Sequence, residues 1–209
     1  MFITLEGPEG SGKSSQLPIL ADWLRQQGFK VHTTREPGGT LIGDQIRAIL
    51  GNLENTNMLP RTEILLFLAS RAQLVEEVMR PLLAEGVIIL CDRYADSTLA
   101  YQGYGHGVDL DTLRQLLNFA TGGLYPDLTL LLDLDVETGL QRRKQSGGEW
   151  NRLDAYALAF HQRVRQGYLA LAQAESQRWI TINADQSFND VQYALRKALA
   201  SSLSITAKA

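Results

Sequence analysis

The chain has 209 residues, of which 44% are hydrophobic and 21% are charged, and its formal net charge is −3. This length suits one sizeable domain, and the composition is globular rather than disordered or fibrous. The acidic balance argues against binding of nucleic acid over the whole surface, although a local cluster of Arg and Lys can still bind phosphate. We therefore expect a single domain over residues 1–209 that does not bind nucleic acid.

Three further features exclude other classes of protein. The single cysteine, Cys91, lies in the apolar run Val87–Cys91, so it cannot form a disulfide within the chain and is expected to be a buried strand thiol. The three histidines show no metal-ligand spacing, which argues against structural zinc. No apolar stretch approaches the roughly 20 residues that span a bilayer, and residues 1–6 lack the basic start of a signal peptide. We expect a cytoplasmic protein without a membrane partner.

The chain opens with a strand, a glycine-rich turn and a helix. Phe2–Leu5 is a short apolar run that stops at the turn Gly7–Gly12. From Lys13 to Gln27 apolar residues recur at helical spacing, and Gly28 suits the position that ends such a helix. This order matters because phosphate-binding loops lie between a strand and a helix.

The turn fits the phosphate-loop pattern G-x-x-x-x-G-K-[ST]. Its glycines allow successive backbone N–H groups to point inward at phosphate oxygens, and the following helix adds the positive end of its dipole. The Lys13 ammonium can bridge the β- and γ-phosphates, and the Ser14 hydroxyl can bind Mg²⁺. We expect ATP to be bound by Gly7, Pro8, Glu9, Gly10, Ser11, Gly12, Lys13, Ser14 and Ser15.

The remaining elements alternate in the same way. After Gly28 the patterns are, in order, a strand at Lys30–Thr34, a helix at Leu41–Leu50, irregular residues 51–60, a helical region from about Arg61 to Leu83, and a strand at Val87–Leu90. Beyond these lie a strand at Leu128–Leu132, helices at Val136–Lys144 and Asp154–Ala174, a strand at Trp179–Ile182 and a helix at Phe188–Ala200. This alternation predicts an α/β fold with three layers, in which a five-stranded parallel sheet is flanked by helices on both faces.

Two segments are not expected to join the packed core. The glycine-bearing stretch 145–151 is flanked by arginines and suits a mobile lid, which we place near residues 142–153. The small, polar residues 201–209 are expected to fray.

Charged residues at strand ends indicate an anion site. Asp92 directly follows the strand Val87–Cys91, where it can hold Mg²⁺ or orient a phosphate, although a helix cap or loop aspartate is the alternative. Each arginine at a strand end, in a loop or near the lid can equally be a solvated surface residue. As a set on an acidic chain they favour a site for phosphoryl transfer between anions. They are Arg35, Arg71, Arg93, Arg142, Arg143 and Arg152.

Three motifs resemble the signatures of bacterial thymidylate kinases, which are P-loop nucleoside monophosphate kinases. They are REPGGT at Arg35–Thr40, FLASRAQ at Phe67–Gln73, and DRYADSTLAYQG at Asp92–Gly103. The segment Arg152–Tyr168 also resembles the lid and following helix of that family. The resemblance covers the chain except for its last ten residues, and it implies a P-loop kinase fold and an enzyme that phosphorylates dTMP for dTTP synthesis.

The resemblance also implies where dTMP binds. Phe67 would stack on the thymine ring, and Arg71 would fix the base or the acceptor phosphate. Arg35 and Arg93 would clamp that phosphate, and Glu9 would contact the 3′-hydroxyl. The sugar and the base edge would be contacted by Ser97, Thr98, Tyr101 and Gln102, with Tyr101 crowding the 2′ position. Structural roles for Thr98 and Gln102 remain alternatives.

The family has two arrangements, with a basic residue either inside the phosphate loop or in the lid. The loop interior Pro8–Ser11 carries no Arg or Lys, whereas Arg143, Lys144 and Arg152 border the lid. The chain therefore resembles the lid-arginine type. By this resemblance Arg152 would contact the transferred phosphoryl group and Arg142 would pack on adenine, although Trp150 and the glycines of the lid depart from the family pattern.

We therefore expect in-line, Mg²⁺-dependent transfer of the γ-phosphoryl group of ATP to dTMP, with Lys13, Arg93, Arg152 and Glu9 as catalytic residues. A phosphate oxygen is already ionised, so no strong general base is needed. The resemblance further implies a homodimer. The helices Arg61–Leu83 and Asp154–Ala174 offer apolar faces for an interface, although the same residues would serve equally as core. The alternatives are another nucleotide kinase on the same fold, a nucleotide-dependent switch, and a nucleic-acid-dependent ATPase.

Overall fold

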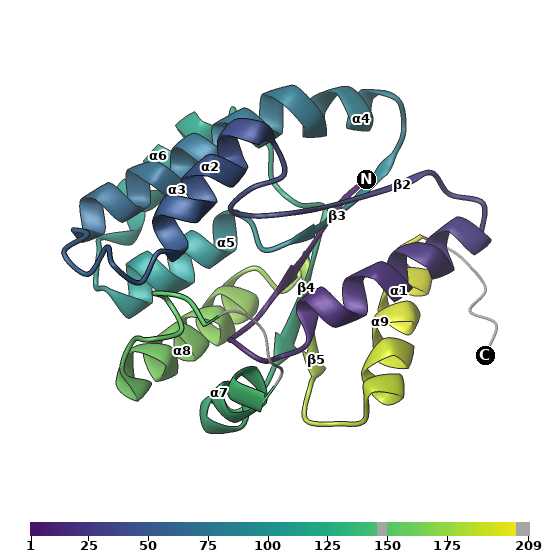
Figure 1. The fold of residues 1–209 in the computed structure, drawn as a ribbon. Helices are drawn as coiled ribbons and strands as arrows, with labels where there is room; N and C mark the ends of the chain where they lie inside the picture. The colour runs from purple at the N-terminus through teal and green to yellow at the C-terminus, as the bar shows by residue number, and fades with distance from the viewer. Residues whose placement is uncertain (146–149, 204–209) are drawn as a thin grey trace.

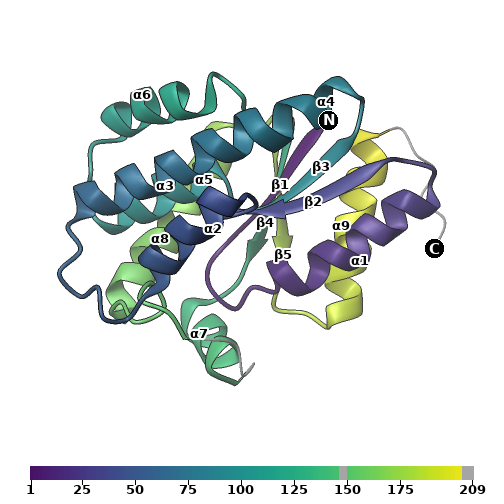
Figure 2. The same ribbon diagram turned by 45° about the horizontal axis from the view of Figure 1, so that its top comes forward.

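The computed structural model describes residues 1–145 and 150–203. Its centre is a parallel five-stranded sheet with the strand order β2-β3-β1-β4-β5, shown in Figures 1 and 2. The strands are β1 Phe2–Glu6, β2 Val31–Arg35, β3 Ile88–Asp92, β4 Leu128–Asp133 and β5 Trp179–Asn183. Each lies within one or two residues of its predicted bounds, so the predicted fold class is confirmed.

Both faces of this sheet are buried, because the strands are apolar at consecutive positions rather than at alternate ones. On β1, for example, Phe2 faces one core cluster and Ile3 faces the other. On β3, Ile89 and Cys91 face the first cluster. The prediction of a buried thiol is thus confirmed, and burial raises the pKa of Cys91 well above its usual value.

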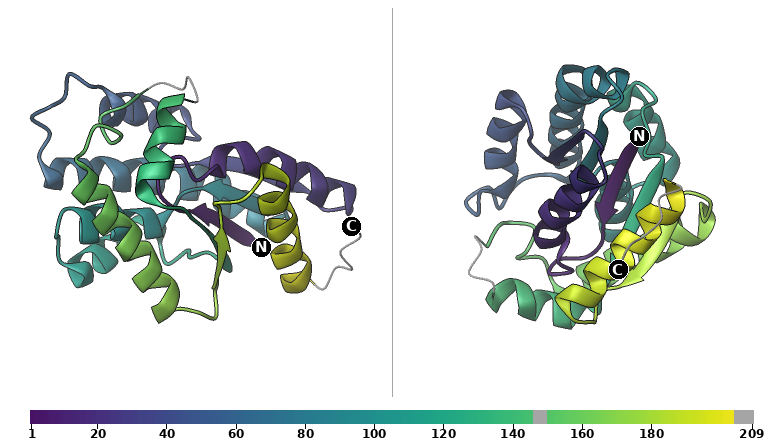
Figure 3. Two further views of the ribbon diagram at one scale, coloured as in Figure 1. Left: turned by 90° about the horizontal axis from the view of Figure 1, so that it is seen from below. Right: turned by 90° about the vertical axis from the view of Figure 1, so that its right-hand side faces the viewer.

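Helices complete the outer layers. Helices α1 (Lys13–Gln26) and α9 (Phe188–Ser202) lie side by side against one face of the sheet (Figures 1 and 3). The opposite face packs against α3 (Pro60–Leu74), α6 (Leu110–Thr121) and α8 (Leu158–Ala174). Two further helices, α2 (Leu41–Gly51) and α7 (Val136–Gln145), approach the carboxyl-terminal ends of the strands. Among the described residues no helix has the length and apolarity needed to cross a membrane.

Several helix bounds differ from the sequence expectation. The region predicted as one helix from Arg61 contains α3, a π-helical segment η1 at Val75–Met79, and the short α4 at Arg80–Ala84. The chain after β3 forms the short α5 at Ala95–Thr98 and a second π-helical segment, η2, at Leu99–Gly105. Helix α9 continues to Ser202, and residues 204–209, which hold most of the expected frayed tail, lie outside the described residues.

The helix predicted from Asp154 begins at Leu158 instead. Asn151 explains the difference, because its side-chain oxygen accepts hydrogen bonds from the backbone N–H groups of Leu153 at 2.8 Å and Asp154 at 3.2 Å. These bonds stabilise a turn over residues 152–155, and the extended backbone of Ala157 (φ −61°, ψ 151°) separates this turn from the helix. Of the predicted lid near 142–153, residues 146–149 lie outside the described residues.

Strand register brings the predicted motifs to one edge of the sheet. Asp92 pairs with Leu5 of β1 on one side and with Arg35 of β2 on the other. Because all strands run in the same direction, the loops that follow β1, β2 and β3 leave from the same edge. This edge is where open parallel sheets bind ligands.

Candidate active site

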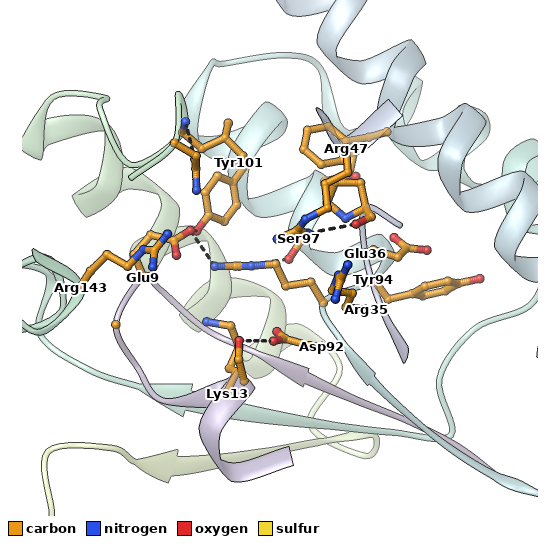
Figure 4. Close-up of a pocket in the computed structure, with 18 of the residues that line it drawn as sticks. Glu9, Lys13, Arg35, Glu36, Arg47, Asp92, Tyr94, Ser97, Tyr101 and Arg143 are labelled. Carbon is orange, nitrogen blue, oxygen red and sulfur yellow. Dashed lines mark hydrogen bonds and ion pairs between the residues drawn. The ribbon is translucent and has the colours of Figure 1, made fainter. Parts of the chain in front are cut away.

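A cavity of about 470 Å³ lies at this edge of the sheet (Figure 4). Among the predicted site residues it is lined by Glu9, Gly10, Gly12, Lys13, Ser14, Ser15, Arg35, Phe67, Arg71, Asp92, Arg93, Ser97, Thr98, Tyr101, Gln102 and Arg142. The other three predicted loop residues, Gly7, Pro8 and Ser11, are not among the lining residues but accept hydrogen bonds from Lys13. Glu9 and Arg142, which are far apart in the sequence, thus line a single cavity together with basic and aromatic groups.

The phosphate loop packs tightly against α7. Gly10 has a φ of 71°, and a Cβ on it would lie 1.9 Å from the carbonyl oxygen of Gly139. Conversely, a Cβ on Gly139 would lie 2.2 Å from the carbonyl oxygen of Glu9. The loop can therefore follow this path only because both positions are glycine. Gly139 was not predicted as part of the site, since a lone glycine in a helical pattern carries no local signal.

Lys13 is held inside the loop. Its Nζ donates to the carbonyl oxygens of Gly7 and Pro8, both at 2.9 Å, and to Ser11 Oγ at 3.1 Å. Burial and the nearby Arg93 lower the pKa of Lys13 to about 8, against the opposing effect of Glu9. The ammonium is consequently a preorganised positive charge at the wall of the cavity.

The two predicted metal ligands lie together. Ser14 Oγ, at the start of α1, donates to Asp92 Oδ2, at the end of β3, at 2.5 Å. A hydroxyl and a carboxylate are the hard oxygen donors that Mg²⁺ takes when phosphates and water complete its shell. In the described part of the chain no group of three or more His, Cys, Asp or Glu could hold a metal ion by itself. This pair therefore fits Mg²⁺ that arrives with nucleotide.

Arg93 links the phosphate loop to α8. Its φ of 70° places it in the left-handed region, which a non-glycine residue adopts only where its surroundings hold it. The guanidinium donates to Glu9 Oε1 at 2.7 Å, to the Gly7 carbonyl at 3.1 Å and to the Tyr168 hydroxyl at 3.0 Å. Tyr101 also donates to Glu9, at 2.7 Å. Burial by itself would raise the pKa of Glu9, but Arg93, Lys13 and the Tyr101 hydroxyl lower it to about 2.

At the end of the cavity beside α3, Arg71 is buried and its donors face protein groups. It donates to Glu36 Oε2 at 2.7 Å, to Thr98 Oγ1 at 3.0 Å and to the Tyr94 carbonyl at 3.1 Å. The second oxygen of Glu36, Oε1, is buried and has no hydrogen-bond partner among residues 1–145 and 150–203. Phe67 and Thr98 also line the cavity; Thr98 accepts from Arg71, and Phe67 lies four residues before Arg71 on α3. This end thus combines an aromatic face with polar groups, which is the composition that suits a planar heterocycle.

Ser97 has a different environment from the one expected. Its hydroxyl donates to Glu6 Oε2 at 2.6 Å, and Tyr168 donates to the same oxygen at 3.0 Å. Burial, together with Asp96, raises the pKa of Glu6 to about 7. Ser97 lines the cavity but is tied to this buried carboxyl group.

The structure does not bring Arg152 to the cavity. Its guanidinium forms an ion pair with buried Glu63, and it donates to the Leu50 carbonyl at 3.1 Å and to the Tyr156 hydroxyl at 2.8 Å. The lining arginines on the lid side are instead Arg142 and Arg143. Arg142 donates to the Ala184 carbonyl at 2.9 Å and to Asp185 at 3.1 Å, so it packs at the end of β5.

Sequence reasoning missed two charged groups that line the cavity, Arg47 and Glu36. Arg47 projects from α2 opposite the phosphate loop (Figure 4), and it donates to the Pro37 carbonyl at 3.0 Å. No local pattern distinguishes Arg47 from a solvated helix arginine. Glu36 could have been predicted, because it lies next to Arg35 in the same motif and a buried carboxylate needs a cationic partner. In the structure that partner is Arg71.

Comparison with known proteins gives a consistent result. The family model described as "Thymidylate kinase" matches residues 5–195. A thymidylate kinase of Roseiflexus sp. (strain RS-1) is 53% identical over 198 residues, which cover 90% of this chain and 88% of that protein. One of Trichlorobacter lovleyi is 49% identical and covers 98% of this chain and 99% of its own. The crystal structure of thymidylate kinase from Ehrlichia chaffeensis superposes with a TM-score of 0.79 at 32% identity, over 95% of this chain and 98% of that one.

Proposed function

The chain belongs to the thymidylate kinase family and phosphorylates dTMP, and we propose that it does so by Mg²⁺-dependent transfer of the γ-phosphoryl group of ATP in the cavity described above. The family implies ATP as the donor and the products dTDP and ADP. The observation that carries the proposal is the position of Lys13, Asp92 and Arg93 around one space at the carboxyl edge of the sheet. ATP would bind on the phosphate loop, Gly7–Ser15, and dTMP on the side of Phe67.

Catalysis would consist of positioning and charge neutralisation. Lys13 would bind the β- and γ-phosphates of ATP from inside the loop. Arg93, held at Glu9 and Tyr168, would bridge the two substrates by contacting the acceptor phosphate. Ser14 and Asp92 would hold Mg²⁺, which supplies positive charge to the phosphate oxygens when it is bound. Because the attacking phosphate oxygen is already ionised, no side chain needs to remove a proton.

The acceptor site would use the remaining lining residues. Phe67 would stack on thymine while Arg71 and Thr98 contact its polar edge, and Arg35 would contact the acceptor phosphate. Tyr101 donates to Glu9, so both side chains are fixed beside the position proposed for the sugar, with Tyr101 at the 2′ and Glu9 at the 3′ position. The further dTMP contacts proposed are Ser97 and Gln102. Together these groups select a planar base on a deoxyribose.

On the lid side we propose Arg142 as a contact of adenine. Arg143, which lines the cavity, is proposed to contact the transferred phosphoryl group. Arg152, which the sequence favoured for that contact, is the alternative, because the structure holds it in its ion pair with Glu63. A positive charge at this place neutralises the transition state when the lid closes.

ADP release coupled to a spectrophotometric readout tests the function, with ATP, Mg²⁺ and each nucleoside monophosphate in turn. We expect turnover to be fastest with dTMP, and to stop when Mg²⁺ is chelated and resume when Mg²⁺ is restored. Faster release with a different acceptor would overturn the assignment of the Phe67 end. Release that does not depend on any acceptor would overturn the transfer mechanism.

We further propose a homodimer in the cytoplasm. Exposed apolar side chains support the dimer, since Leu65 on α3 is 54% exposed and Phe119 on α6 is 89% exposed. Helix α8, the second expected interface, exposes Leu158 and Leu169 less, at 39% and 36%. Exposed apolar surface of this kind is typical of association surfaces, and α3 and α6 pack against each other. Light scattering at micromolar concentration should give twice the chain mass, and Phe119→Glu should reduce it; a wild-type monomer would refute the dimer.

A further inference from the structure

Glu63 joins three parts of the molecule beneath the cavity. Its carboxylate lies on α3 and is 1% exposed. Oε1 accepts a hydrogen bond from Gln102 Nε2, on η2, at 2.7 Å. Oε2 accepts from Tyr156 at 3.1 Å and forms the ion pair with Arg152, both of which precede α8. The carboxylate therefore connects the segment that follows the lid to a residue that lines the active-site cavity.

The carboxylate of Glu63 acts only as an acceptor. Burial by itself would raise the pKa of Glu63, but contacts from His106, Gln102 and Arg152 lower it to about 2. An ionised carboxylate has no proton to donate. The amide of Gln102 must therefore point its nitrogen, not its oxygen, toward Glu63.

The remaining polar atom of Gln102 is its amide oxygen. Within the part of the chain that the structure describes, this oxygen has no hydrogen-bond partner, although Gln102 is 1% exposed. Gln102 lines the cavity together with Phe67 and Thr98, and Arg71, four residues after Phe67 on α3, donates to Thr98, four residues before Gln102. The group that Gln102 offers to a bound base is thus an acceptor.

We propose that Glu63 is a positioning residue that fixes the amide of Gln102 with its oxygen toward the acceptor base, and that this favours bases with an N3–H donor over cytosine. Thymine and uracil carry a proton on N3, whereas N3 of cytosine is an acceptor and would face the amide oxygen unpaired. The inference rests on the proposed binding of the base beside Phe67. It adds a residue that acts through another one and does not itself contact the substrate.

Glu63→Gln provides a test because its effect has a defined direction. Arg152 can only donate, so the new side chain must keep an oxygen toward Arg152 and place its NH₂ group toward Gln102. The amide of Gln102 then has to rotate by half a turn and present its own NH₂ group to the cavity. The variant should lose a hydrogen bond to thymine and gain one to cytosine.

The measurement is kcat/KM for dTMP, dUMP and dCMP with saturating ATP and Mg²⁺. In Glu63→Gln we expect the preference for dTMP over dCMP to fall by about tenfold or more, which corresponds to one hydrogen bond. The preference for dTMP over dUMP should not change, because both bases carry N3–H. Tyr156→Phe is the matched control, since it removes a different donor to Glu63 and leaves the contact to Gln102; its dTMP to dCMP ratio should equal that of the wild type.

A double-mutant cycle separates the failure of this proposal from failure of the base site. Gln102→Met should also lower the dTMP to dCMP ratio, and Glu63→Gln should lower it no further in that background. An unchanged ratio in Gln102→Met would overturn the base site itself. A lowered ratio in Gln102→Met with an unchanged one in Glu63→Gln would overturn the role of Glu63 alone.

Loss of activity by the same factor for all three acceptors in Glu63→Gln would mean a merely structural role and would also overturn the proposal. If Glu63→Gln does not fold, NMR of wild-type protein with ¹⁵N-labelled glutamine replaces it. Nuclear Overhauser contacts from the Gln102 amide protons to the Glu63 side chain would support the proposal. Contacts from those protons to bound dTMP would refute it.

Discussion

Lys13→Ala should lower kcat for dTMP phosphorylation by about 10³-fold, the scale on which removal of one preorganised charge-stabilising group acts. In the transition state negative charge spreads over the oxygens of the transferred group. The Lys13 ammonium is fixed by two carbonyl oxygens and Ser11 Oγ, so it is oriented before ATP arrives. Steady-state kinetics with saturating substrates measure the effect directly.

The same variant should remain folded. The pKa of Lys13 is lowered to about 8 by burial and by Arg93. At neutral pH the charged ammonium therefore has a free-energy cost in the folded chain that it does not have in the unfolded chain. That cost is fully present below pH 8 and disappears as the pH rises toward the ordinary lysine value of about 10.5. Since alanine removes this cost, we expect the Tm at pH 7 not to fall.

Lys30→Ala is the matched control, because Lys30 is an exposed lysine away from the cavity. It should keep both activity and Tm. Full turnover by Lys13→Ala would contradict the role of the ammonium, and a collapse of its Tm would mean that Lys13 is needed for folding.

Replacement of Arg93 should separate catalysis from stability. Both Arg93→Gly and Arg93→Ala remove the guanidinium that contacts Glu9 and the phosphate loop, so kcat/KM for dTMP should fall by about 10²-fold or more in each. Their stabilities should differ, because residue 93 has a φ of 70°. Glycine adopts this conformation freely, whereas alanine is strained there by roughly 1 kcal/mol.

Urea unfolding of the two variants measures this difference, since both lose the same side-chain contacts. Arg93→Gly should have the higher free energy of unfolding. Arg114→Ala serves as the control, because Arg114 forms only an exposed pair with Asp111 and such pairs contribute little. Equal stability of the glycine and alanine variants would show that the left-handed conformation is not retained without the guanidinium.

The proposed base site and the segment before α8 are joined by buried charge rather than by apolar contact alone. Glu63 binds Gln102 on one side and Arg152 on the other, and Glu36 binds Arg71 beside Thr98. A buried ion pair is sensitive to loss of one partner, because the remaining charge stays unpaired. Substitution of Glu36 or Glu63 should therefore alter binding of the base, although neither carboxylate is proposed to contact the phosphate or the sugar.

The local parts of the molecule followed from the sequence by itself. The phosphate loop depends on consecutive backbone N–H groups and on glycines within eight residues, so its pattern is complete in one short stretch. The strands were located to within two residues because a doubly covered parallel strand is apolar at consecutive positions. Asp92 was placed correctly at the sheet edge for the same reason, as it directly follows such a strand.

Tertiary structure alone decided which charged groups meet. Arg143 and Arg152 both border the lid in sequence, yet the turn set by Asn151 directs Arg152 to Glu63, 89 positions away, while Arg143 lines the cavity. Arg47 and Gly139 reach the site only because α2 and α7 pack over the sheet edge. A long charged side chain is compatible with many local sequences. Its partner is therefore fixed by the packing of distant elements and not by its neighbours in the chain.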